Sequence, residues 1–356
     1  MAKSIGYEVI GIEAQNRRTV HGGTCVGPGK LEEIKKLVDD KSVQKVIFAN
    51  ALSSSKIFRI QKVLGRDINV IDRNLLILEV FDKRAMTTEA KLQIELARLK
   101  YTFSWGREFI KAGGLQGQQV GWGGPGEYPY FDYEREYRKR ISHLELQLRD
   151  LYTRKDNLRE RRHAQGFLVV ALAGYTQSGK TTFFNRLSRE KKTIGLGPFT
   201  TLSTSARRIT VQDDSGNKSF ILVDSIGFIE DMDPIILDAF NTTLGEIIQA
   251  DIILLFIDVS EDLSTIRRKL VTSRKIIMQT DIMHRTIICA NKVDTINEEA
   301  LDNAEKEIEG FFPALPIVAI SASTGKEIDK LLSLVVSTLG NVTPSKYRTM
   351  MPLNNT

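Results

Sequence analysis

The nine residues Gly174-Tyr-Thr-Gln-Ser-Gly-Lys-Thr-Thr182 constrain the fold of this chain more than any other feature. They follow the apolar run Phe167–Ala173 directly and lead into a segment with helical character, Thr182–Arg189. A G-x-x-x-x-G-K-[ST] pattern between a strand and a helix is typical of a phosphate-binding loop in an α/β sheet. Its backbone N–H groups and the helix N-terminus both attract phosphate. We therefore expect nucleotide contacts from Gly174, Tyr175, Thr176, Gln177, Ser178, Gly179, Lys180, Thr181 and Thr182.

A second motif, Asp224-Ser225-Ile226-Gly227, follows the apolar strand Phe220–Val223 and supplies the expected metal side of the site. An aspartate at a strand end can hold Mg²⁺ through water, together with the hydroxyl of Thr181. The N–H of Gly227 can meet a γ-phosphate, and Lys180 can bridge the β- and γ-phosphates. We expect Lys180 and Gly227 to act on the phosphate that is transferred.

The base is expected to be guanine, because of two later motifs. Asn291-Lys292-Val293-Asp294 follows the strand Thr286–Ala290, and the Asp294 carboxylate can accept hydrogen bonds from the guanine N1–H and exocyclic amine. Adenine lacks that pair of donors. A backbone N–H in Ser321-Ala322-Ser323, after the strand Pro316–Ile320, can read guanine O6. With Ile252–Asp258 as a further strand, each motif lies at the carboxyl end of a parallel strand, where such sheets bind ligands.

A GTPase also needs a threonine between the phosphate loop and Asp224 that responds to the γ-phosphate. The segment Phe199-Thr200-Thr201-Leu202-Ser203-Thr204 offers several candidates, and their spacing alone does not choose among them. The residue after Gly227, by contrast, allows a definite expectation. Many GTPases have a glutamine there to orient the attacking water, and this chain has Phe228, which has no donor or acceptor. Slow intrinsic turnover is expected.

The amino-terminal part predicts a small parallel α/β subdomain over residues 1–80. Short apolar runs alternate with amphipathic stretches, which is typical of such a sheet. The expected strands are Tyr7–Ile12, Lys45–Ala49 and Ile68–Ile71, and the expected helices are Lys30–Asp40 and Ser54–Leu64.

Residues 84–163 predict a long antiparallel helical hairpin. Leucines recur at helical spacing before and after a segment, Gly113–Gly126, that contains seven glycines. Residues 133–163 carry ten Lys/Arg against six Asp/Glu. The glycine-rich loop offers glutamines and Trp122 for contact with unpaired bases, and Arg135, Arg138, Lys139 and Arg140 offer a basic surface for phosphates. On residue types alone, a solvated helix beside a linker is as good an interpretation.

Composition agrees with a two-domain chain, since 356 residues and 42% hydrophobic content are those of ordinary globular proteins. No apolar run reaches the roughly 20 residues that span a bilayer, and the N-terminus has no apolar core of a secretion signal. The two cysteines, Cys25 and Cys289, form no redox or metal motif and are expected to be buried in a reducing cytoplasm. A net charge of +6 permits an acidic partner such as RNA.

Several segments resemble the HflX family of translational GTPases. In the GTPase part these are the phosphate loop, Phe199–Leu202, Asp224–Ile229 and Asn291–Asp294. The amino-terminal part agrees independently, and the resemblance covers roughly residues 7–340. Its segments are Gly27-Pro-Gly-Lys-Leu-Glu-Glu-Ile34, Val70–Arg73, Thr88–Leu96 and Gly121–Glu127.

The resemblance implies a Ras-like P-loop GTPase domain, at 167–340, behind an HflX-type amino-terminal domain at 1–166, with a tail at 341–356. It implies GTP/GDP and Mg²⁺ as ligands, with Thr201 as the switch threonine and a metal contact beside Thr181 and Asp224. It also implies a protein that binds the large (50S) ribosomal subunit and its RNA. From its composition the protein is expected to be cytoplasmic, and it is expected to be a monomer. Characterised relatives dissociate the subunits of stalled ribosomes.

Three departures from the family pattern stand out. Gln177 replaces the commoner asparagine that in related GTPases helps to hold K⁺, and Ser323 replaces the commoner lysine of the guanine loop. The sixteen residues after 340 are too few for the extra carboxyl-terminal domain of many bacterial members. Two other functions stay open: a GTP-gated RNA chaperone or remodelling factor, and a protein-interaction switch that involves no RNA.

Overall fold

The computed structural model describes residues 1–65, 67–114, 127–164, 166–188, 205–213, 216–224, 227–228, 233, 235–236, 250–278 and 285–340. By its internal contacts the chain divides into two compact units, Met1–Arg149 with Met232–Phe240, and Asp150–Asp231 with Asn241–Thr356. The boundary at residue 166 expected from the sequence stays a prediction. No helix in the described part of the chain is both long and apolar enough to cross a bilayer.

The first unit begins with a small α/β arrangement. After the short helix η1 (Ala2–Ile5), its elements are α1 (Pro28–Asp40), β1 (Lys45–Ile47), α2 (Ser54–Leu64), β2 (Asn69–Ile71) and α3 (Arg73–Arg84). β1 and β2 pair in parallel, as expected, with Val46 opposite Val70. Buried apolar residues of α1 and α2, such as Leu31 and Ile60, pack in one core with Val70 of β2. Asp72 begins α3 by accepting the N–H of Leu75 at 2.9 Å, and it is fully buried.

The expected strand Tyr7–Ile12 is wrong, because this segment lies outside any sheet. Its apolar side chains gain little burial, and Ile12 is 87% exposed. Side chains hold the segment instead. The Tyr7 hydroxyl donates to Glu79 at 2.8 Å, and Glu13, directly after the segment, forms an ion pair with Lys30 at 2.5 Å. Contacts of this kind fix the position of a segment without a backbone ladder, and a pattern of apolar residues does not reveal them.

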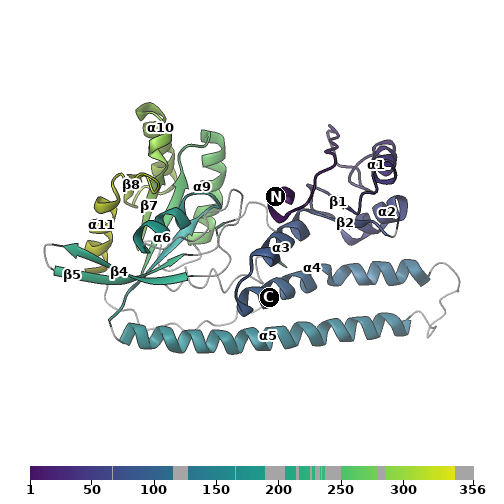
Figure 1. Cartoon of the computed structure of the whole chain (residues 1–356), viewed down its shortest axis with the longest axis horizontal. Helices are drawn as coiled ribbons and strands as arrows, with labels where there is room; N and C mark the ends of the chain where they lie inside the picture. Colours follow the sequence, from purple (N-terminus) through teal and green to yellow (C-terminus); the bar gives the residue numbers. More distant parts are fainter. Residues whose placement is uncertain are drawn as a thin grey trace. The chain divides into compact units, whose positions relative to one another are not determined.

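Two long helices follow, α4 (Thr88–Gly114) and α5 (Glu127–Ala164), which run alongside each other in Figure 1. Their contacts have antiparallel order, since Glu95 of α4 pairs with Arg140 of α5 and Phe103 stacks on Tyr133 with ring centroids 6.4 Å apart. Leu144 and Leu148 belong to the leucines that recur at helical spacing, and both are buried as that spacing predicts. Leu158 has the same spacing but is 51% exposed, so the buried stripe does not extend that far along α5. Residues 115–126, most of the predicted glycine-rich loop, lie outside the described residues.

The second unit is built around a six-stranded sheet of order β4-β5-β3-β6-β7-β8. Its strands are β3 (Val169–Gly174), β4 (Ser205–Asp213), β5 (Gly216–Asp224), β6 (Ile252–Asp258), β7 (Thr286–Asn291) and β8 (Ile317–Ile320). All neighbours are parallel except β4 and β5, which pair antiparallel. The sequence predicted the five parallel strands but not the edge strand β4.

Helices cover both faces of this sheet (Figure 1). They are α6 (Lys180–Ser188), α9 (Leu263–Met278), α10 (Glu298–Phe311) and α11 (Ile328–Gly340). Alternate residues of β3 face opposite sides. Leu172 packs in one core with α6 and α11, whereas Ala173 packs in the other with α9 and α10. Cys289 is buried in the first core and Cys25 in the first unit, as expected. This layering leaves the carboxyl ends of the strands to carry the candidate site.

Candidate functional site

The phosphate loop lies between β3 and α6, with Lys180 as the first residue of the helix. The Lys180 side chain is 5% exposed, and its Nζ donates to the carbonyl oxygens of Gly174 at 2.9 Å and Tyr175 at 2.6 Å. Burial lowers the pKa of Lys180 to about 8, against the opposing attraction of Asp224. Among the described residues, the hydrogen bonds of the buried Lys180 ammonium go to neutral carbonyls of its own loop. A phosphate there would add negative charge next to the ammonium.

Asn291, at the end of β7, connects the phosphate loop to the candidate guanine loop. Its Nδ2 donates to the carbonyl oxygen of Ser178 at 2.7 Å, and its Oδ1 accepts the N–H of Ala322 at 2.9 Å. Gly179 makes this approach possible, since a Cβ there would lie 2.0 Å from Asn291 Nδ2. Gly179 also has a φ of +97°, which favours glycine. Asn291 is 1% exposed, and both ends of its side-chain amide take part in holding these two loops.

Thr181 and Asp224 meet at the expected metal side of the site. The Thr181 hydroxyl donates to Asp224 Oδ2 at 3.2 Å, and both residues are buried. A hydroxyl and a carboxylate are oxygen ligands of the kind that Mg²⁺ prefers, so this pair fits the ion. Nearby, Ser178 Oγ is buried and has no hydrogen-bond partner among the described residues, as expected for a group that meets a phosphate oxygen. Predicted contacts that lie outside the described residues are Phe199, Thr200, Thr201, Ser225 and Ile226.

Gly227 and Phe228 lie against the phosphate loop. The N–H of Phe228 donates to the Gly174 carbonyl at 2.9 Å, and the Phe228 carbonyl accepts the N–H of Thr176 at 3.2 Å. The Phe228 ring is 4% exposed and packs edge-on against Tyr175, with centroids 6.0 Å apart. A Cβ on Gly227 would lie 2.9 Å from Lys180 Nζ. Gly227 therefore lies close to the ammonium group of Lys180.

The candidate base-reading residues lie after β7 and β8. Asp294, in the short helix η3 (Val293–Thr295), is exposed, and hydrogen bonding to Ser321, with a smaller contribution from Ser323, holds its pKa below the ordinary value. Ser323 Oγ donates to Asp294 Oδ2 at 3.2 Å. Lys292 forms an ion pair with Asp258 of β6, so its ammonium is directed to the neighbouring strand. The structure thus brings Asp294 next to the Ser321–Ser323 loop.

One residue near these loops was not identified from the sequence. Arg186 of α6 donates from Nε to the Ala322 carbonyl at 2.9 Å and from Nη2 to the Ser323 carbonyl. No motif marks this arginine, because its partners are backbone atoms of a loop 136 residues away along the chain.

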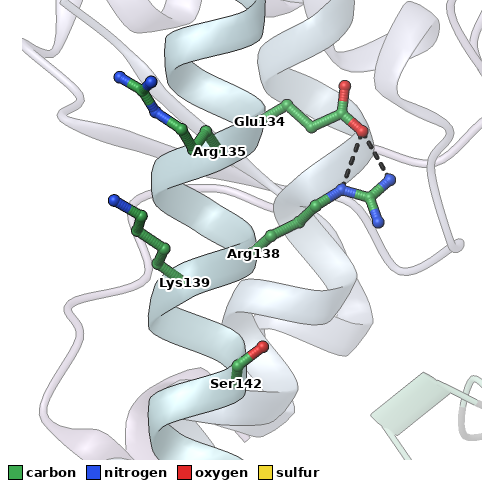
Figure 2. Close-up of a pocket in the computed structure, with 5 residues that line it drawn as sticks. All are labelled: Glu134, Arg135, Arg138, Lys139 and Ser142. Carbon is green, nitrogen blue, oxygen red and sulfur yellow. Dashed lines mark hydrogen bonds and ion pairs between the residues drawn. The ribbon is translucent and has the colours of Figure 1, made fainter.

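A second candidate surface lies on α5, where a groove of about 650 Å³ is lined by Glu134, Arg135, Arg138, Lys139 and Ser142. Figure 2 shows the Arg135 and Lys139 side chains extending to one side of the helix, while Arg138 turns to Glu134 on the other. Arg138 Nη2 lies 2.6 Å from Glu134 Oε1, and its guanidinium lies over the Phe103 ring. Arg140 pairs with Glu95, so Arg138 and Arg140, both expected phosphate contacts, have carboxylate partners in this structure.

Comparison with known proteins assigns all three parts of the chain. Residues 1–82 match the model "GTP-binding GTPase N-terminal", residues 84–162 "GTP-binding GTPase Middle Region" and residues 169–292 "50S ribosome-binding GTPase". GTPase HflX of Thermococcus kodakarensis is 39% identical over 92% of this chain and 73% of its own length. GTPase HflX of Thermofilum pendens is 38% identical over 95% of this chain and 78% of its own.

Solved structures agree with this assignment. A crystal structure of SsGBP with GDP is 25% identical, with a TM-score of 0.54 over 96% of this chain and 93% of that one. A GTP-binding protein of Sulfolobus solfataricus in complex with GDP, 24% identical, has a TM-score of 0.50 over 96% of this chain and 94% of that one, which shows a common fold. The resemblance noted in the sequence is confirmed, and the chain is a GTPase with a 50S ribosome-binding GTPase domain. It belongs to the HflX family.

Proposed function

We propose that the site at the carboxyl ends of β3, β5, β7 and β8 binds GTP and GDP, and that GTP hydrolysis there is coupled to the large ribosomal subunit. The observation that carries the nucleotide site is the position of Asn291, which holds the loop of Lys180 and the loop of Ala322 together. A phosphate at one loop and a base at the other would then lie at the two ends of one ligand.

In this proposal, residues of the phosphate loop and Gly227 bind the phosphates, and Asp294 binds the base. Lys180 and the loop N–H groups hold the β- and γ-phosphates, and Gly227 offers its N–H to the γ-phosphate. Asp294 accepts hydrogen bonds from guanine N1–H and the exocyclic amine. Its depressed pKa keeps the carboxylate ionised throughout the physiological pH range. Gln177, with a φ of +66°, occupies a bend of the phosphate loop where the family commonly has asparagine.

Thr181, Asp224 and Thr201 would hold Mg²⁺, with Asp224 acting through water. The ion neutralises charge on the β- and γ-phosphate oxygens when bound. Thr181 and Asp224 are already hydrogen-bonded to each other, so little rearrangement is needed to direct both oxygens to the ion. Thr201 is carried over from the family pattern, and it lies outside the described residues.

Hydrolysis without the partner is proposed to be slow. Phe228 cannot orient water, and its ring is buried against Tyr175. The subunit, or a polar group that it moves into place, supplies the missing function.

The partner is proposed to be 50S RNA, bound through the helical hairpin of α4 and α5. The unpaired bases of ribosomal RNA suit the glutamines and Trp122 of the glycine-rich loop, and Arg135 and Lys139 in the α5 groove suit its phosphates. In this proposal the chain acts in the cytoplasm as a monomer that separates stalled or idle ribosomes.

Co-sedimentation with purified subunits tests the partner. We expect binding to 50S subunits with a non-hydrolysable GTP analogue and weaker binding with GDP, and faster GTP hydrolysis when 50S subunits are added. Unwinding of free RNA without any effect of 50S subunits would instead indicate an RNA remodelling factor. Salt-insensitive binding of another protein, with neither effect, would indicate a protein-interaction switch.

A further inference from the structure

The loop after β8 is a closed turn organised by Ser321. The Ser321 N–H donates to the Lys326 carbonyl at 3.1 Å, and the Ser321 carbonyl accepts the N–H of Gly325 at 2.8 Å. Ser321 Oγ also accepts the N–H of Thr324 at 3.1 Å. These bonds fix where the loop begins and ends. The bond of the Thr324 N–H also orients the Ser323–Thr324 peptide. The orientation of the Ala322–Ser323 peptide is left to contacts from outside the loop.

Arg186 supplies one of those outside contacts. Its guanidinium donates to the carbonyls of both Ala322 and Ser323, which is a bidentate contact with consecutive peptides. Gly325 leaves room for it, because a Cβ there would lie 2.8 Å from Arg186 Nη1. The φ of Gly325 is +96°, so the turn and the close approach both favour glycine at this position.

Holding the Ala322 carbonyl also directs an N–H group. In a trans peptide the C=O of one residue and the N–H of the next point in opposite directions, and the described residues contain no cis peptide. With the Ala322 oxygen on Arg186, the Ser323 N–H points to the other side of the loop. The Ala322 N–H is already bound to Asn291 Oδ1. Ser323 therefore presents the next amide along the loop, in an orientation that Arg186 sets.

Ser323 has a second role through its hydroxyl. Ser323 Oγ lies 3.0 Å from Ser321 Oγ and donates to Asp294 Oδ2 at 3.2 Å. The carboxylate that we propose for guanine recognition is thus hydrogen-bonded to the residue whose amide Arg186 directs, in addition to its larger interaction with Ser321. A lysine, which is commoner in the family at this position, has no acceptor and cannot form the same serine pair.

We propose that Arg186 is a positioning residue for base recognition and that Ser323 determines specificity for the guanine 2-amino group. Arg186 directs the Ser323 N–H at O6, and the Ser323 hydroxyl acts together with Ser321 to hold Asp294 for the N1–H and the amine. This inference rests on the guanine site proposed above and assigns two residues to it that the motifs do not.

The test is titration of the full-length protein with GDP, with IDP (which keeps O6 but lacks the 2-amino group) and with inorganic pyrophosphate. Arg186→Ala is expected to weaken GDP and IDP by the same factor, about tenfold, since both carry O6. Arg186→Lys, which keeps one donor group, is expected to recover part of the loss. Ser323→Ala is expected to reduce the preference for GDP over IDP by about fivefold.

The affinity for pyrophosphate shows whether Arg186→Ala acts on the base loop alone or disturbs α6 as a whole. This affinity should fall much less than that for GDP in Arg186→Ala, because the arginine acts at the base end and reaches the phosphate loop only through Asn291. Equal losses for pyrophosphate and GDP would overturn the proposal. Arg267→Ala is the matched control, since Arg267 is an exposed arginine that donates from Nε and Nη2 to Glu307 on another helix. It should bind all three ligands like the parent.

The site assignment is tested separately by Asp294→Asn. Unchanged GDP affinity in that variant would refute the guanine site itself. If Asp294→Asn weakens GDP but Arg186→Ala does not, only the role of Arg186 is refuted, and an unchanged GDP-to-IDP preference in Ser323→Ala refutes the role of Ser323. Should Arg186→Ala fail to fold, Arg186→Lys and Ser323→Ala give the same comparisons.

Discussion

The amide nitrogen of Phe228 lies 2.9 Å from the carbonyl oxygen of Gly174 and donates a hydrogen bond to it. This bond, and its counterpart from Thr176 to Phe228, joins the backbone after Gly227 to the phosphate loop. The aromatic contact between Phe228 and Tyr175 reinforces the junction. The buried Phe228 ring therefore stabilises the phosphate loop, and it has no polar group that could orient a water molecule.

Intrinsic GTP hydrolysis is therefore expected below about 0.01 per second without ribosomal subunits. Phe228→Ala should not raise that rate, because alanine adds no polar group, and loss of the buried ring should lower the free energy of unfolding by about 3–5 kcal/mol. Single-turnover hydrolysis and chemical denaturation measure the two effects. Fast partner-free turnover that Phe228→Ala leaves unchanged would contradict this role.

The affinity for GDP should depend on the protonation of Lys180. Its pKa in the nucleotide-free protein is about 8, and a bound phosphate would raise it, so binding takes up a proton above that pH. From about pH 7 to about pH 8.8, where guanine keeps its N1 proton, affinity should fall about sixfold. Calorimetry in buffers of different ionisation enthalpy measures the proton uptake. Lys180→Ala should bind the triphosphate very weakly and show no such pH dependence.

The same lysine affects stability in a defined direction. Its pKa is lower in the folded protein than its ordinary value of 10.5, so between about pH 8 and pH 10.5 the unfolded chain binds more protons. The contribution of Lys180 to the free energy of unfolding should therefore increase as pH rises through that range. Comparing the pH dependence of denaturation in the parent and in Lys180→Met isolates this contribution, and parallel profiles would argue against a buried, charged Lys180.

Asp294→Asn should exchange base specificity. The amide loses the charged acceptor for guanine, which costs about 2–4 kcal/mol, or roughly 30- to 1,000-fold in GTP affinity. It gains a donor that suits the O2 of xanthine, so xanthosine triphosphate should bind better to the variant than to the parent. Competition between the two nucleotides measures the exchange. GTP affinity equal to that of the parent would exclude Asp294 as the base reader.

Replacing Arg138, Lys139 and Arg140 with alanine should weaken binding to 50S subunits and flatten its salt dependence, by at most about 2–3 units of the log–log slope. GTP affinity should stay near that of the parent. The triple variant also removes the partners of Glu134 and Glu95. Both are exposed pairs, which contribute about 0–1 kcal/mol each, so folding should survive.

Two further variants sharpen this test. Glu95→Ala breaks the same pair as Arg140→Ala without removing a cation, and it should keep full subunit binding. Arg135→Ala with Lys139→Ala removes the two cations that Figure 2 shows extending away from Glu134. If these variants and a deletion of residues 116–122 all co-sediment with 50S subunits like the parent, the hairpin is not the ribosome-binding element.

The sequence predicted those parts of the site that depend on residue type at the end of a strand. Lys180, Asp224 and Asn291 lie where their motifs place them, because the carboxyl ends of parallel strands share one edge of the sheet. The five parallel strands were predictable as well, since residues such as Ile252–Ile257 are buried throughout and form unbroken apolar runs.

What the sequence did not predict depends on contacts without a local signal. Among the described strands, β4 lies at the edge of the sheet beside β5, and it has Arg207 and Arg208 within it, so it lacks an apolar run. Tyr7–Ile12 has the composition of a strand, but side-chain contacts hold it outside the sheet. Arg186 recognises carbonyl oxygens, which every residue has, so no residue type in the loop identifies its partner.

The hydrogen bonds of Asn291 to the phosphate loop and to the Ser321–Ser323 loop have a consequence for nucleotide binding. The buried side-chain amide of Asn291 is bonded both to the Ser178 carbonyl and to the Ala322 N–H. A ligand that orders the phosphate loop therefore also helps to order the loop of Ala322, and the reverse holds as well. Diphosphate alone would then leave the base loop better arranged for guanosine, and guanosine alone would do the same for diphosphate. The two fragments should bind cooperatively even when no covalent bond joins them, and Asn291→Ala should abolish that cooperativity.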